Sequence, residues 1–289
     1  MAVMRSGVRS PSAPPILDLG ILRPGLLNYP IVQSVTVEQL QKLHYDRIGA
    51  EYESHYGDAC SGQYREQFIN EPMFEGIDLR GLEVLEAMCG SGQTTEFLLS
   101  KGARVTGLDI STDEIDSFRR RWPGSDAKCG SILSSGLASD AFDCVAVVGG
   151  LHHLHPHLSD ALREMHRILK PGGRLCFAEP HQGSIPDRVR SFWYKHDDLF
   201  ASNEASIDLE SLKKEFSAAF SFDKEEYLGN VGYLLVLNSM VFRIPLKLKR
   251  WYTPVLLRSE ALINRLQRKW SACFVVSQWK KLELPRTEL

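Results

Sequence analysis

Short apolar runs alternate with helix-length segments between residues 82 and 179. Runs that have the length of buried strands are Glu83 to Ala87, Arg104 to Leu108, Ala127 to Cys129, Phe142 to Val148 and Arg174 to Ala178. Amphipathic stretches near 94–100, 112–121 and 159–169 lie between them and predict helices. This alternation predicts repeated βαβ units in a doubly wound, mostly parallel sheet. The sequence Lys170-Pro171-Gly172-Gly173 predicts a turn that leads into the strand from Arg174.

Further elements extend this α/β core on both sides. Helices are expected from Thr36 to Tyr52, from Gln63 to Asn70 and from Leu209 to Phe220. Strands are expected near Phe222 to Tyr227 and Cys273 to Trp279, which brings the sheet to seven strands. Residues 230–270 then form an insertion between the last two strands, at a place where it would cover a site at the sheet edge.

These elements divide the chain into five parts. Residues 1–27 combine Ser, Pro, Gly and Arg without periodicity and predict a flexible arm. The remaining parts are a helical cover at 28–80, the cofactor-binding sheet domain at 81–229, a helical lid at 230–270, and the closing strand and tail at 271–289.

The composition of the 289 residues, 43% hydrophobic and 24% charged, is typical of a globular protein. The sequence contains no apolar window of about 18 residues and no apolar leader near its start, which favours a cytoplasmic protein. No Cys-x-x-Cys pair occurs. We therefore expect reduced core thiols at the six cysteines, which are Cys60, Cys89, Cys129, Cys144, Cys176 and Cys273.

Charge is distributed unevenly, although the net charge is only −2. Eight basic residues lie between Arg243 and Lys269, against Glu260 as the one acid. Trp251 lies among them, and Trp270 follows directly. Such a segment suits peripheral contact with an anionic membrane, a cover over a phosphorylated lipid-like substrate, or a solvated helical cap. The sequence leaves these three alternatives open.

Two strand ends carry the features of a nucleotide cofactor site. The first strand ends in Glu86, and the small-residue turn with Gly90 and Gly92 then opens a helix whose N–H groups attract negatively charged groups. The next strand ends in Asp109, about twenty residues downstream, where a carboxylate binds ribose hydroxyls. An NAD site is disfavoured, because Thr95 occupies the position of its third small residue and Glu86 would repel a pyrophosphate.

At this point the sequence resembles a known family. The matching segments are Tyr45 to Tyr52, Glu86 to Gly92, Asp109, Phe142-Asp143, Leu151-His152-His153-Leu154 and Leu169 to Gly173. They resemble class I (Rossmann-like) S-adenosylmethionine-dependent methyltransferases, in the small-molecule branch similar to the ubiquinone and menaquinone pathway enzymes. The resemblance covers about Tyr45 to Glu179. It implies S-adenosylmethionine as cofactor and a role in small-molecule biosynthesis.

The resemblance also implies which residues contact the cofactor. They are Tyr45, Tyr52, Glu86, Ala87, Gly90, Gly92, Asp109, Ile110, Ser131, Ile132 and Gly149. Among them, Glu86, Gly90 and Gly92 would hold the methionine portion, and Asp109 the ribose. The chain departs from the family at Met88, where glycine is usual, and at Ser131, where an acid is usual. Because methionine does not easily adopt a positive φ, we expect ordinary backbone geometry at Met88.

Methyl transfer from a sulfonium depends mainly on alignment, so a general base is needed only for acceptors that must lose a proton. His152, His153, His155 and His157 follow the fourth strand, at the sheet edge where such folds bind ligands. We take His153 and His152 as candidate bases, with core packing as the alternative for each. Glu179 and His181 follow the fifth strand and are candidate acceptor contacts. No metal site is expected, because the histidine spacing is loose.

The sequence therefore predicts an enzyme that methylates a small, lipophilic or lipid-linked acceptor, with the target atom (O, N or C) left open. A catalytically degenerate cofactor-binding or scaffold protein is the first alternative, and an NAD-type oxidoreductase is the second. A nucleic-acid partner is disfavoured, because Gly149-Gly150-Leu151-His152 replaces the Asp/Asn-Pro-Pro-aromatic loop of amino-methylating enzymes.

Overall fold

The computed structural model describes residues 56–194, 205–239, 242 and 244–283. The helix expected from Thr36 to Tyr52 and the arm expected at 1–27 lie outside the described residues.

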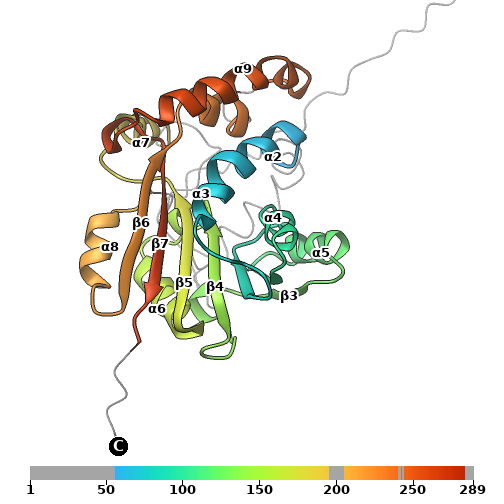
Figure 1. The fold of residues 1–289 in the computed structure, drawn as a ribbon, viewed down its shortest axis with the longest axis vertical. Coiled ribbons are helices and arrows are strands. Elements are labelled where there is room, and N and C mark those ends of the chain that lie inside the picture. Colours follow the sequence, from blue (N-terminus) through green and yellow to red (C-terminus); the bar gives the residue numbers. More distant parts are fainter. Residues whose placement is uncertain (1–55, 195–204, 240–241, 243, 284–289) are drawn as a thin grey trace, which may run out of the picture. The chain divides into compact units, whose positions relative to one another are not determined.

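Seven strands of the described chain form one sheet in the order β3-β2-β1-β4-β5-β7-β6 (Figure 1). Their bounds are β1 Glu83–Ala87, β2 Arg104–Asp109, β3 Asp126–Cys129, β4 Phe142–Val148, β5 Leu169–Glu179, β6 Phe220–Leu228 and β7 Phe274–Lys281. All neighbours are parallel except for β7, which runs antiparallel to both β5 and β6. The predicted α/β class and the doubly wound, mostly parallel seven-stranded sheet are confirmed.

Helices cover both faces of this sheet. The α-helices are α2 Ala59–Arg65, α3 Glu71–Phe74, α4 Thr95–Ser100, α5 Thr112–Arg121, α6 Leu158–Ile168, α7 Ile185–Tyr194, α8 Leu209–Glu215 and α9 Leu246–Asn264. A π-helical segment, η1 Glu66–Asn70, joins α2 to α3. Local sequence accounts for the ends of α5: the Ser111 hydroxyl accepts the Glu114 N–H at its start, and three arginines face its negative end.

Strict alternation along the strands assigns side chains to two cores. Val84 of β1 packs with α2, α3, α4 and α5 on one face, whereas Leu85 packs with α6 and α8 on the other. Cys144 and Val145 of β4 repeat this division. Glu86 has the parity of Val84, so its carboxylate is directed to the face that α2 and α4 cover.

The strand β5 begins earlier than the sequence analysis expected. Leu169 already pairs with Phe142, and the next pair joins Arg174 to Cys144, so the Lys-Pro-Gly-Gly segment is an irregularity inside β5. The prediction of a turn before the strand was therefore wrong about where the strand starts. Lys170 holds the irregular segment in place, because its Nζ lies 2.8 Å from Asp143 Oδ2 beside the start of β1.

All six cysteines are free, and four of them are buried. Cys60 is half-buried, and Cys129 is exposed, so the prediction of a core thiol was wrong for Cys129. The reason is its strand: β3 lies at the edge of the sheet, and none of its side chains is fully buried.

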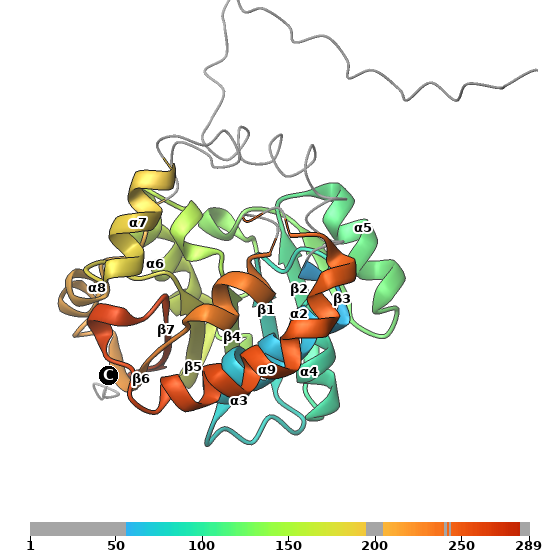
Figure 2. The same ribbon diagram turned by 90° about the horizontal axis from the view of Figure 1, so that it is seen from above.

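The described part of the insertion between β6 and β7 contains the π-helical segment η4 Tyr233–Leu237 and the long helix α9. Helix α9 lies along α2 (Figure 2). The Lys249 Nζ is 2.5 Å from Asp58 Oδ2, and the Tyr64 hydroxyl donates to Glu260 Oε1 at 2.5 Å. Within the described residues, no helix is both long and apolar enough to cross a membrane.

Candidate cofactor pocket

A pocket opens at the carboxyl ends of β1, β2 and β4, the edge at which doubly wound sheets bind ligands. Its lining residues include Glu86, Ala87, Gly90, Asp109, Ile110, Ser131, Ile132, Gly149 and His153. The structure thus brings eight of the eleven expected cofactor residues into one pocket, together with one candidate base. Tyr45 and Tyr52 lie outside the described residues, and Gly92 is not among the lining residues.

The turn after β1 is built in a way that the sequence analysis did not expect. Met88 has a φ of 56°, so the prediction of ordinary backbone geometry there was wrong. The residue keeps the left-handed conformation that suits glycine, at a cost of about 1–2 kcal/mol. Gly150 makes room for the side chain, because a Cβ on Gly150 would lie 2.8 Å from Met88 Sδ.

Gly92 contributes to packing behind the turn. Its φ is 85°, and a Cβ at this position would lie 2.8 Å from both Phe118 Cδ2 and Thr95 Oγ1. The Trp122 indole closes the same space and donates to the Ser91 carbonyl at 3.1 Å. Gly92 therefore lets α4 and α5 approach the turn closely.

Asp109 at the end of β2 joins two neighbouring loops. Its Oδ2 accepts the Gly90 N–H, and its Oδ1 accepts the Ser111 N–H, each at 2.9 Å. Since a carboxylate oxygen can accept more than one hydrogen bond, these two backbone contacts are compatible with ligand hydroxyls at the same carboxylate. The side chain therefore fits vicinal ribose hydroxyls while it holds the turn against β2.

Glu86 is a buried carboxylate in the pocket wall. Its Oε1 accepts the Thr94 N–H at 2.9 Å, and its Oε2 accepts the Thr95 hydroxyl. Burial raises the pKa of Glu86 to about 7, against the hydrogen bonds from these threonines and the charge of Arg65. Near neutrality the carboxyl group is therefore partly ionised, and a positively charged ligand group beside it would stabilise the ionised form.

Arg65 is a pocket residue that the sequence analysis missed. It ends α2, is 6% exposed, and lines the pocket together with Glu86. Its Nη1 donates to the Tyr56 carbonyl at 2.5 Å. A helix was expected at Gln63 to Asn70, but a single arginine on a helix is usually a surface residue, so its spacing alone did not mark Arg65 as buried.

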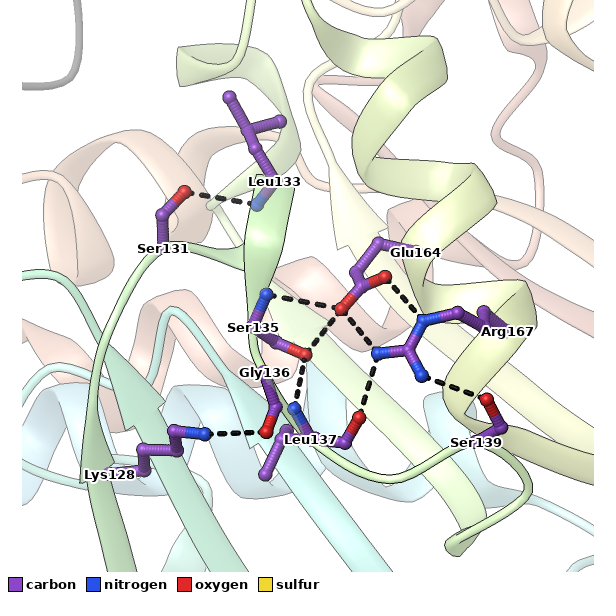
Figure 3. Close-up of polar contacts among 9 residues, drawn as sticks. All are labelled: Lys128, Ser131, Leu133, Ser135, Gly136, Leu137, Ser139, Glu164 and Arg167. Carbon is purple, nitrogen blue, oxygen red and sulfur yellow. Dashed lines mark hydrogen bonds and ion pairs between the residues drawn. The ribbon is translucent and has the colours of Figure 1, made fainter.

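The loop after β3 forms another wall of the pocket (Figure 3). The Ser131 hydroxyl accepts the Leu133 N–H at 3.0 Å and so caps the short 3-10 turn Ile132–Ser134. Farther along, Glu164 of α6 accepts the Ser135 N–H at 3.1 Å, and Arg167 donates to the Leu137 carbonyl at 2.8 Å. Helix α6 therefore holds the loop in position from behind.

The candidate bases occupy different environments. His152 and His153 lie in the 3-10 turn Leu151–His153 with ring centroids 3.9 Å apart, and His153 lines the pocket whereas His152 does not. His152 Nδ1 is 2.8 Å from Glu179 Oε2. Glu179 Oε1 accepts the N–H groups of Gly150 and Leu151, each at 2.7 Å.

Glu179 and His181, the candidate acceptor contacts, are buried away from the pocket lining. Glu179 is fully buried and fixes the backbone of the histidine turn. His181 packs edge-on against Tyr227, with ring centroids 4.8 Å apart. The geometry therefore suits both side chains for support, and it leaves His153 as the histidine at the pocket surface.

Comparisons with known proteins agree with this geometry. A family model described as a methyltransferase domain matches residues 85–177. The demethylmenaquinone methyltransferase of Staphylococcus epidermidis is 31% identical over 173 residues, which make up 57% of this chain and 71% of that protein. The malonyl-[acyl-carrier protein] O-methyltransferase of Enterobacter lignolyticus is 32% identical over 144 residues, 48% of this chain and 57% of that protein.

Solved structures share the fold. The crystal structure of the [4+2]-cyclase SpnF matches with a TM-score of 0.61 at 17% identity, covering 86% of this chain and 97% of that one. The sequence matches are shorter: the chain spans only 57% of the length of the Enterobacter relative. Coverage of 71% of the Staphylococcus relative at 31% identity nevertheless shows that the chain belongs to the class I (Rossmann-like) S-adenosylmethionine-dependent methyltransferases, whose cofactor is S-adenosylmethionine.

Proposed function

We propose that this protein transfers a methyl group from S-adenosylmethionine to a small, lipophilic acceptor. The observation that carries the proposal is the lining of one pocket. It contains Asp109, a carboxylate suited to ribose hydroxyls, and two buried residues of opposite charge, Glu86 and Arg65. An amino acid zwitterion needs both of these charges, whereas a pyrophosphate would be repelled by Glu86.

Each cofactor portion has a matching part of the wall. Glu86 would accept the methionine ammonium, and Arg65 would donate to its carboxylate. Ile110 and Ile132, which follow β2 and β3, offer apolar surfaces for the adenine ring. The Ser131 hydroxyl would meet the adenine edge without the charge that an acid brings.

When bound, the sulfonium supplies an electrophilic methyl group and a neutral thioether leaving group. The chain then has to align the acceptor and exclude water. His153 lies at the pocket surface and would accept a proton from an acceptor hydroxyl as the new bond to the methyl group forms. From an ammonium or an acidic carbon it would take the proton first, because that atom has no free electron pair for the attack until the proton has left. Glu179 would act as a positioning residue, because it holds the backbone of the turn that carries His153.

Two observations support a lipophilic acceptor. The pocket wall next to His153 includes Met88 and Leu154, whose side chains favour apolar ligands. The Staphylococcus relative is named as a methyltransferase of demethylmenaquinone. We include oxygen, nitrogen and carbon as target atoms, because His153 suits all three.

Calorimetric titration with S-adenosylhomocysteine tests the cofactor part without an acceptor. We expect micromolar binding that weakens at least tenfold in Asp109→Asn, about 1.4 kcal/mol, because the amide cannot accept hydroxyls at both positions. Asp116→Asn on the exposed side of α5 is the matched control and should bind like the wild type. Binding of NAD in place of S-adenosylhomocysteine would contradict the proposal.

Transfer itself is tested with methyl-labelled S-adenosylmethionine and extracted lipids as acceptors. His153→Ala should lower the rate of transfer far more than the affinity for S-adenosylhomocysteine, and an equal loss of both would remove His153 as the base. The second candidate, a cofactor-binding protein that transfers no methyl group, is favoured by the departures at Met88 and Ser131. Tight cofactor binding without any labelled product would support it.

A further inference from the structure

Helix α9 has a second apolar face that packing does not explain. Its inner face is fixed on α2 by the buried residues Lys249 and Glu260. On the outer face, large apolar side chains recur at helical spacing and are exposed. They are Leu248, Trp251, Val255 and Leu262, with Leu266 in the following turn, and we call them the outer stripe. Trp251 is 74% exposed and Leu266 is 82% exposed.

A row of positive charge follows one side of the outer stripe. Lys247, Arg250, Arg258 and Arg265 are all exposed on adjoining helical positions. Between Glu226 and Glu283 the sequence contains one acid, Glu260, and that side chain is fully buried against α2. The described part of this segment therefore presents apolar and basic side chains to its surroundings and no carboxylate.

Neighbouring elements extend the same surface. The short helix η5 Lys269–Ser271 follows α9, lies against α7 and exposes Trp270. Helix α7 adds Ile185 and Val189, which are four residues apart and exposed. Both α7 and α9 lie at the upper end of the molecule in Figure 1 and face the viewer in Figure 2.

We propose that the outer stripe, its basic row and the exposed side chains of α7 and η5 form a docking face for an anionic lipid bilayer. In this arrangement the axis of α9 lies in the plane of the interface, with Trp251 and Leu266 among the acyl chains and the basic row at the phosphates. Apolar side chains beside basic ones are what such a surface binds. A nucleic acid would use the basic row alone, and a second copy would bring two positive surfaces together.

This docking face is independent of the chemistry in the pocket, although both regions share α2. Asp58, the N-cap of α2, pairs with Lys249 of α9, and Arg65 at the other end of α2 lines the pocket. A lipophilic acceptor would therefore leave the bilayer close to the element that completes the cofactor site.

Co-sedimentation of the full chain with vesicles tests the proposal. We expect binding to vesicles that mix phosphatidylcholine with phosphatidylserine, and at least tenfold weaker binding to phosphatidylcholine alone. Trp251→Asp/Leu266→Asp should lower the binding to mixed vesicles at least tenfold. Lys247→Gln and Arg258→Gln should each lower it about fivefold, and added salt should have the same effect.

Matched controls separate docking from misfolding. Leu99→Asp on α4 and Arg120→Gln on α5 change exposed residues of the same kinds away from this face, and they should bind like the wild type. Circular dichroism should show the same melting for all variants. Equal binding of the wild type and Trp251→Asp/Leu266→Asp would overturn the proposal. So would a wild-type chain that binds no vesicles and dimerises through this face, as judged by sedimentation of the same variants.

Discussion

Two regions of this molecule bury charged side chains around the same helix, and they do so for different purposes. At the junction of α2 and α9, Glu260 is enclosed by Tyr64 and the N–H groups of Asn230 and Gly232. In the pocket, the Glu86 carboxylate is held by Thr94 and Thr95, and the residue is also part of the pocket lining.

Burial raises the pKa of both carboxyl groups, so the raised pKa does not distinguish them. What distinguishes them is the completeness of their surroundings. Glu260 is fully buried among the protein's own elements, whereas Glu86 is 5% exposed and is one of the residues that line the cofactor pocket. A buried charged residue therefore indicates a binding site only where it also lines a pocket.

The largest effect is expected at the junction. Asp58→Ala removes the partner of buried Lys249 and the N-cap of α2, and it should lower the free energy of unfolding by about 4 kcal/mol. Lys249→Met should lower the free energy of unfolding less, because the methionine side chain fills the same space and Asp58 remains partly hydrated. Urea denaturation measures both variants. A larger loss for Lys249→Met would show that the buried lysine contributes more than packing.

Exchanging each buried carboxylate for its amide tests the contrast directly. Glu260→Gln leaves an N–H group of the amide facing the Gly232 N–H, so unfolding should become about 2 kcal/mol easier while binding of S-adenosylhomocysteine stays unchanged. Glu86→Gln can still accept from Thr94 and donate to Thr95, so its stability should hold while its affinity falls at least tenfold, about 1.4 kcal/mol. Urea denaturation and calorimetry of both variants measure these two effects. Lost affinity in Glu260→Gln with unchanged stability, or lost stability in Glu86→Gln with unchanged affinity, would contradict the contrast.

Ligand binding in the pocket should respond to pH. Glu86 has a folded pKa of about 7, above the ordinary value of 4.5, so its contribution to stability is lost as pH rises from about 4.5 to 7. Binding of a ligand ammonium needs the ionised form, so affinity for S-adenosylhomocysteine should rise about tenfold between pH 6 and 8. Glu86→Gln should remove this rise. A wild-type affinity that is flat over this range would show that Glu86 is not the ammonium partner.

The smallest effect concerns the turn that opens the pocket. Met88→Ala keeps the left-handed backbone cost and loses the contact over Gly150, whereas Met88→Gly loses the contact but relieves the backbone. Thermal denaturation should therefore place the glycine variant about 1 kcal/mol above the alanine variant. The reverse order would mean that the backbone at Met88 is ordinary in solution.

Periodicity was sufficient to predict the sheet, whereas most of the pocket residues were implied by the resemblance to the methyltransferase family. The limits of β1 and β4 follow from apolar runs, and the acids at two strand ends pointed to Glu86 and Asp109 from sequence alone. These features are local, and each depends on a few neighbouring residues.

Features that depend on distant segments were not predictable in this way. Arg65 lies at the end of α2 yet lines the pocket together with residues of β1, and the room for the Met88 side chain depends on Gly150, sixty-two residues away. The burial of Lys249 inside an apparently solvated basic segment depends on Asp58 of α2 in the same way. Tertiary contacts decide such cases, and sequence spacing does not encode them.

The position of β7 in the chain affects the order in which the strands can pair during synthesis. Among the strands of the described residues, β6 pairs only with β7. Strand β7 lies between β6 and β5 in the sheet, and it follows β6 in the chain after the α9 insertion. During synthesis, the cofactor half around β1, β2 and β4 emerges first and has its partners within reach. An unpaired β6 must instead wait until residues 274–281 have left the ribosome. During that interval the nascent chain has an open sheet edge, and chaperone binding should be concentrated there.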